Sequence, residues 1–170
     1  MSLSMSQAFI PPTLRQLAAL DAILDKAAAH AAARKIDPAV LLATRLFPDM
    51  FPLVRQVQLT TDFAKGPAAR LAGLEPPKYE DTEASFADLK ARVAKTVAYL
   101  KGLKPEQIDG SETRDITIPI GGQPRTFKGQ PYLVDFAIPN LYFHMTTAYA
   151  ILRSCGVEIG KRDFIGAMPA

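Results

Sequence analysis

The 170-residue sequence has a single cysteine and only two histidines. One cysteine cannot form an internal disulfide, which favours a reducing, cytoplasmic location. Two histidines exclude a metal site built from three. The spacings H-x-x-x-H, H-E-x-x-H and C-x-x-C are missing, as are the glycine-rich loops that bind phosphates. No motif therefore assigns the chain to a class of enzyme.

Clusters of one charge and long apolar runs are missing as well. The 20 basic and 17 acidic residues are interleaved, with a net charge of +3, so we expect no nucleic-acid binding. No uncharged stretch reaches about 18 residues and no secretory leader is evident, so we expect no membrane association. Hydrophobic content of 48% is ordinary for a globular protein. We expect one domain over residues 1–170, with residues 1–6 as a disordered leader.

The most apolar long segment is residues 131–155, which we interpret as a central helix. Pro131 suits the first turn of a helix, and Gly156 suits the position just after its end. The segment is apolar around most of its circumference, with Asn140 and His144 as interruptions. Such a helix is expected to be buried on two sides, one against its own domain and one against a second copy of the chain.

Apolar residues at helical spacing predict three more long helices. The fold class is therefore all-α, a four-helix bundle with a small β-hairpin, residues 114–128, between helices three and four. Two details concern proline: Pro11 and Pro12 should limit the first helix, and Pro67 should kink or break the second. Arg92 is expected to face water, and residues 157–166 to fold back on the bundle. The first three helices are predicted over residues 13–34, 50–73 (capped by Asp49) and 82–101 (capped by Thr82), with a shorter helix after Asp37.

His144 is the leading candidate for chemistry, as a general base. It lies one turn after Asn140, and Thr147 follows one turn on, so these polar side chains could line a pocket in the bundle. Pro139 supports this interpretation, because a proline inside a helix frees the carbonyl of Asp135. The alternative is a core histidine whose ring is satisfied by a neighbouring hydroxyl or carbonyl.

The second helix is the nearest source of further polar groups for such a pocket. Gln56 and Asp62 are predicted to line it, and a divalent metal held by His144 with Gln56, Gln58 and Asp62 is a weaker alternative. His30, at the end of the first helix, is expected to be a surface or edge histidine.

Four segments carry a resemblance to a known family: PDMFPLVRQVQ (48–58), ARLAG (69–73), GLEPP (73–77) and FHMTTAYAILRSCGVEIGKRDFIG (143–166). The chain resembles an uncharacterised bacterial domain family grouped with the DinB/YfiT-like metalloenzymes. The resemblance implies a DinB-type four-helix bundle, usually dimeric. It also implies a divalent metal held by three histidines, one on the second helix and two on the fourth, and similarity to thiol-dependent transferases. Only His144 matches this pattern, because residue 148 is alanine and residues 50–73 contain no histidine.

Three hypotheses follow from the sequence. The leading one is a cytoplasmic homodimer with a small-molecule pocket around His144 and without the three-histidine metal site. The second is a divergent metal-dependent transferase or hydrolase. The third is a structural or interaction dimer in which Asn140 and His144 only satisfy each other or their neighbours.

Overall fold

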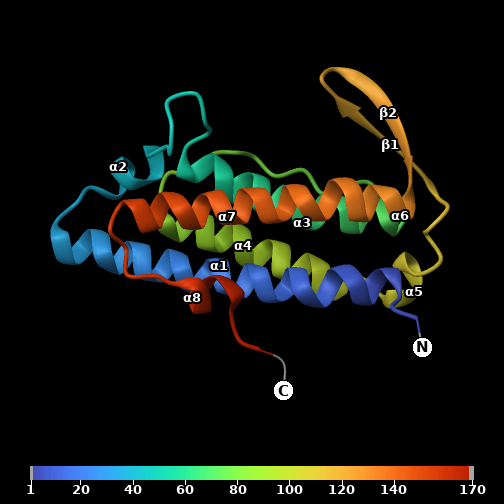
Figure 1. The fold of residues 1–170 in the computed structure, drawn as a ribbon, viewed down its shortest axis with the longest axis horizontal. Helices are drawn as coiled ribbons and strands as arrows, with labels where there is room; N and C mark the ends of the chain where they lie inside the picture. Colours follow the sequence, from blue (N-terminus) through green and yellow to red (C-terminus); the bar gives the residue numbers. More distant parts are fainter. Residues whose placement is uncertain (1, 169–170) are drawn as a thin grey trace.

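The computed structural model describes residues 2–168, and its longest helices run side by side (Figure 1). Helix α1 packs against α4, α4 against α3, and α3 against α7, which form the most extensive helix pair. The core lies between these four helices. The helices are α1 (Met5–Arg34), α2 (Pro38–Ala43), α3 (Leu53–Leu71), α4 (Phe86–Gly102), α5 (Pro105–Ile108), α6 (Gly129–Pro131), the π-helix η1 (Tyr132–Ala137), α7 (Ile138–Ser154) and α8 (Lys161–Ile165).

A small antiparallel sheet of two strands projects from one end of the helical layer (Figure 1). Strand β1 (Asp115–Ile120) pairs with β2 (Gln123–Lys128). Ile116 and Ile118 point into the core while the residues of β2 are mostly exposed. The prediction of a mostly helical protein with a small two-stranded sheet is confirmed. Within residues 2–168, none of the helices combines the length and apolar character that crossing a membrane requires.

Helix α1 starts earlier than the sequence predicted. Ser4 caps it, accepting a hydrogen bond from the Gln7 backbone, and the Gln7 side chain bonds back to the Ser4 backbone. The helix then continues through Pro11 and Pro12, each of which removes one backbone hydrogen bond. Burial of Phe9 and neighbouring side chains stabilises this extension. The expected disordered leader is therefore wrong for its last residues, and residue 1 lies outside the described part of the chain.

The starts of α3 and α4 also differ from the prediction. Helix α3 begins after Pro52, which offers no side-chain cap, rather than after Asp49. Helix α4 is capped by Ser85, whose hydroxyl accepts a hydrogen bond from the Asp88 backbone at 3.1 Å, rather than by Thr82. The segment between α3 and α4 is consequently a long extended crossover that lies along both helices.

Proline has different effects in the two central helices. Helix α3 continues through Pro67 without the expected break. The fourth long segment instead changes geometry ahead of Pro139: residues 132–137 form a π-helix, in which the Ile138 backbone bonds to the Leu133 carbonyl. A π-helical turn holds one extra residue, and such turns are frequent at functional sites. Helix α7 then ends at Ser154, and Gly156 adopts a left-handed conformation as expected.

The C-terminal segment packs back onto the helices, as predicted. Val157 and Ile159 are buried, and α8 lies against α1. The ring of Phe164 meets that of Tyr149 edge-on, with centroids 5.7 Å apart. This contact ties α8 to α7 as well.

Candidate functional site

His144 on α7 faces Gln56 on α3. The Nδ1 atom of His144 lies 2.9 Å from Oε1 of Gln56. The amide nitrogen of Gln56 donates a second hydrogen bond, 3.1 Å long, to the backbone carbonyl of Phe51. Both Gln56 and His144 are buried, at 2% and 8% exposure. Gln56 is therefore the α3 residue that hydrogen-bonds to the histidine, which the sequence could not determine.

The hydrogen bond to Phe51 fixes the protonation pattern of the pair. A backbone carbonyl only accepts, so the Gln56 nitrogen faces Phe51 and its oxygen faces His144. The oxygen also only accepts, so Nδ1 of His144 must carry the proton. In the neutral ring, Nε2 is then the nitrogen with the free lone pair. This arrangement presents a basic nitrogen in a fixed orientation.

The surroundings of the ring favour its neutral form. Burial is the main cause that lowers the pKa of His144 to about 4, and the nearby Arg55 guanidinium lowers it further, while Asp62 acts in the opposite direction. At neutral pH the imidazole is uncharged. It can accept a hydrogen bond through Nε2 without first losing a proton.

Two phenylalanines hold the plane of the imidazole. The ring of Phe63 stacks on it, with centroids 5.4 Å apart and planes inclined by 18°. Phe143 meets it edge-on at 5.3 Å, although Phe143 itself is 57% exposed. His144 therefore lies near the surface, between a partly buried ring and an exposed one.

The other residues predicted for this pocket have separate partners. Asn140 donates to the Phe136 carbonyl at 2.7 Å, and Thr147 to the Phe143 carbonyl at 2.8 Å, both within their own helical segment. These bonds satisfy the Asn140 amide nitrogen and the Thr147 hydroxyl, the polar groups that had suggested a pocket in this segment. They do not join Asn140 or Thr147 to His144.

Gln58 and Asp62 belong to a different cluster, centred on Arg92. Gln58 donates to Glu83 at 2.8 Å, and the Arg92 guanidinium donates to Asp62 at 2.8 Å. Asp62 also pairs with Lys65 at 2.9 Å. The four weak metal-ligand candidates thus separate into the His144–Gln56 pair and this second group. Within residues 2–168, no three His, Cys, Asp or Glu side chains gather closely enough to hold a metal ion.

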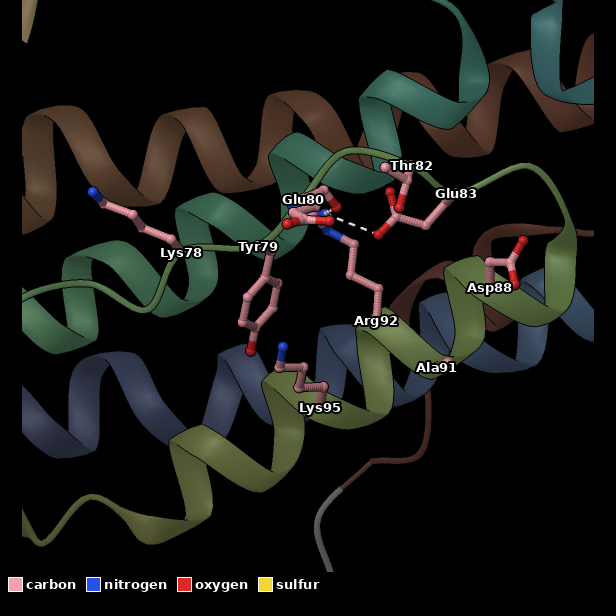
Figure 2. Close-up of a pocket in the computed structure, with 9 residues that line it drawn as sticks. All are labelled: Lys78, Tyr79, Glu80, Thr82, Glu83, Asp88, Ala91, Arg92 and Lys95. Carbon is pink, nitrogen blue, oxygen red and sulfur yellow. Dashed lines mark hydrogen bonds and ion pairs between the residues drawn. The ribbon is translucent and has the colours of Figure 1, made fainter.

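Arg92 is buried, which corrects the expectation that it faces water. Its guanidinium donates to Glu83 at 3.0 Å and to Thr61 at 2.7 Å, and forms an ion pair with Asp81 at 3.0 Å. Figure 2 shows Arg92 reaching from α4 towards the crossover segment, beside a pocket of about 550 Å³. Because its donors are engaged by protein groups, we interpret Arg92 as the anchor of the crossover. Its position on a charged helical face concealed this role in the sequence.

Tyr79 completes this anchor. Lys65, Arg92 and Lys95 approach its ring at 4.6, 5.2 and 4.3 Å from the centroid. Burial raises the pKa of the Tyr79 hydroxyl. The crossover is therefore held on α3 and α4 by ion pairs and by cation–π contacts.

Comparison with known proteins identifies the family. Residues 5–165 match the model of a domain of unknown function, DUF1993. The chain belongs to the DUF1993 family. It is also similar to a solved structure, a DinB family member from Shewanella denitrificans, at 42% identity and a TM-score of 0.88 over 97% of this chain and 93% of that one. No curated protein matches. The resemblance to an uncharacterised DinB-like family is thus confirmed.

The three-histidine metal site implied by the DinB resemblance does not fit this DUF1993 domain. Position 148, one turn beyond His144, is a fully buried alanine. Helix α3 carries no histidine. His30 lies elsewhere, near Gly156, where its buried Nε2 has no hydrogen-bond partner among residues 2–168. One imidazole without a second or third leaves the metal site of the resemblance incomplete.

Proposed function

We propose that this DUF1993 domain binds a small organic molecule beside His144, with the free Nε2 of the ring as the contacting atom. The observation that carries the proposal is the Gln56–His144 hydrogen bond, which fixes the tautomer and leaves Nε2 unprotonated. A ligand hydroxyl, amide or thiol would donate to this nitrogen. If contact with the ligand raised the pKa towards neutrality, the same nitrogen would act as a general base.

The proposal includes a cytoplasmic homodimer built on the DinB-type four-helix bundle, with the hairpin between α4 and α7. Exposed phenylalanines near the pair support dimerisation: Phe51, whose carbonyl binds Gln56, is 54% exposed and Phe143 is 57% exposed. Large exposed rings at one place favour contact with a second copy. The single cysteine supports the location.

A rival function is metal-dependent transfer or hydrolysis. One observation favours it: a histidine that donates Nδ1–H to an oxygen and offers Nε2 has the arrangement common among metal ligands. The remaining ligands would have to come from groups that do not now face the ring.

One experiment separates these functions. Untagged protein and the variants His144→Ala and Gln56→Leu are purified without chelator, and their metal content is measured. Each is then dialysed against a bacterial small-molecule extract, and retained compounds are compared by mass spectrometry. We expect at least one compound that wild type retains and His144→Ala loses. Equal retention by both proteins would contradict binding at His144. Near-stoichiometric metal that His144→Ala loses would support the rival function.

Size-exclusion chromatography with light scattering tests the dimer. We expect a dimer for wild type and a monomer for Phe143→Ser, and no change for Ala98→Ser, a matched substitution on the exposed side of α4. A monomeric wild-type protein at micromolar concentration would contradict this part of the proposal.

A further inference from the structure

A concave region lies further along α3 and meets the His144 site at Phe63, whose ring stacks on the imidazole. It is bounded by α3, β1, η1 and the crossover near Pro76, and has a volume of about 510 Å³. This size lies in the usual range of small-molecule pockets. Arg70, which also lines the region, is four turns from Gln56, or about 21 Å along the helix axis. The Arg70 end of the region is therefore distant from the His144–Gln56 pair.

The walls combine apolar surface with two cations and one carboxylate. Phe63, Phe136 and Ile118 supply apolar surface, and Lys65 and Arg70 supply positive charge. The carboxylate is that of Asp62, which is already paired with Lys65 and Arg92. The rings of Phe63 and Phe136 meet edge-on at 5.8 Å with planes inclined by 61°, so together they form a continuous apolar wall. A flat apolar group packs well against such a wall.

Arg70 is the cation whose charge is left without a partner. Its guanidinium donates to the Tyr132 hydroxyl at 3.3 Å, and no carboxylate among residues 2–168 forms an ion pair with it. Lys65, by contrast, pairs with Asp62, which is shared with Arg92. A guanidinium at the edge of an apolar wall is suited to bind a carboxylate through two parallel hydrogen bonds.

Gly66 makes room for this guanidinium. A Cβ atom at Gly66 would lie 2.9 Å from Nη1 of Arg70, one turn further along the helix. Glycine and the adjacent Pro67 are both unfavourable inside a helix, and both line the pocket. On the opposite wall, the π-helix presents Tyr132 and Phe136 with their rings stacked at 5.8 Å. At this pocket α3 thus carries residues that disfavour a helix, and η1 has π-helical rather than α-helical geometry.

We propose that this pocket binds an aromatic monocarboxylate, with the carboxylate on Arg70 and the ring against Phe63 and Phe136. The hydroxyl of Tyr132, already a partner of Arg70, lies beside the bound carboxylate. The carboxylate contact on Arg70 does not involve His144, although the two sites share the Phe63 ring.

Benzoate is the probe that tests the site, followed by ¹H–¹⁵N NMR of the full chain. Saturable shifts are expected at Gly66, Arg70 and Phe136. Benzamide, the neutral analogue, and inorganic phosphate, which lacks the ring, are each expected to bind about tenfold more weakly or worse. Benzamide binding as tightly as benzoate would overturn the role of Arg70. Phosphate binding as tightly would overturn the role of the wall formed by Phe63 and Phe136.

Variants connect the shifts to the pocket. Arg70→Leu and Gly66→Ala, the second of which displaces the guanidinium, should each weaken benzoate binding about tenfold. The control Arg153→Leu, at an exposed arginine of α7, should bind as wild type. Thermal unfolding confirms that each variant is folded. Unchanged binding by folded Arg70→Leu, or absence of saturable shifts in wild type, would overturn the proposal.

Discussion

Gln56 and His144 form a hydrogen-bonded pair across the most extensive helix contact of the protein. The Oε1 atom of Gln56 lies 2.9 Å from Nδ1 of His144, and its orientation is set by the bond from Gln56 to the Phe51 carbonyl. One glutamine thereby determines which nitrogen of the histidine is available to a ligand. The predictions below start from this pair.

Replacing Gln56 with glutamate should raise the pKa of His144. A carboxylate at the same distance from Nδ1–H would stabilise the imidazolium, and a close opposite charge shifts a pKa by about 1–3 units. An NMR titration of the ring measures the change. Gln58→Glu is the matched control, since Gln58 faces Glu83 rather than His144. An equal rise in both variants would show that the effect is not carried by the hydrogen bond.

Stability should fall as the pH is lowered from about 6.5 towards 4, in part because of His144. Its pKa is lowered from 6.5 to about 4 in the folded protein, so between these values the unfolded chain binds the proton and the folded chain does not. The free energy of unfolding therefore increases with pH across this window and levels off above it. A shift of this size corresponds to about 3 kcal/mol.

Urea unfolding of wild type and His144→Gln at several pH values measures this contribution. The glutamine variant should show a shallower loss of stability below pH 6.5, since it removes one group that titrates differently in the two states. Parallel curves for the two proteins would contradict the assignment.

Arg92→Met should destabilise the protein by about 2–4 kcal/mol, because the substitution leaves the carboxylates of Asp62, Asp81 and Glu83 without their shared cation. The expected loss of stability is smaller than that on breaking a fully buried ion pair, because Asp62 and Asp81 are partly exposed. Urea unfolding provides the measurement. Lys101→Met, at an exposed position on the same helix, should change stability by less than about 0.5 kcal/mol. Similar losses for both would indicate that the crossover is not anchored by Arg92.

Gly129→Ala should be among the most damaging small substitutions in the chain. A Cβ atom there would lie 1.9 Å from the backbone oxygen of Ser111, and a backbone contact cannot move aside as a side chain can. We expect a loss of about 3 kcal/mol or more, measured by thermal or urea unfolding. Gly102→Ala is the control, as a Cβ at Gly102 would meet nothing within 4 Å. A Gly129→Ala protein as stable as the control would contradict the close approach.

Helix content and the core face of each long helix could be predicted from apolar periodicity, which a buried helix must show. The local departures from this pattern could not be predicted from periodicity. Pro11 and Pro12 suggested a helix boundary, but burial of Phe9 carries α1 past them. Arg92 follows the charged pattern of an exposed face, although carboxylates of α3 and of the crossover surround it. These outcomes depend on tertiary contacts that no local pattern contains.

The candidate site could be predicted only in part, because it also depends on tertiary contacts. His144 stood out as a polar residue on an apolar stripe, and Gln56 was included among the residues that could face it. Which α3 residue faces His144 depends on the rotation and register of α3 against α7, which the sequence does not define. Gln58 and Asp62 lie on the same helix as Gln56, yet Gln58 bonds to Glu83 of the crossover and Asp62 to Arg92 of α4.

The most direct test of the account is a long-range ¹H–¹⁵N NMR spectrum of His144, recorded as a function of pH. The account predicts a neutral ring at pH 7, protonated on Nδ1, with a pKa of about 4. It also predicts that Gln56→Leu releases the ring from this single tautomer. A ring protonated on Nε2, or one that titrates near its ordinary value of 6.5, would contradict the claim that Gln56 holds Nε2 free for a ligand.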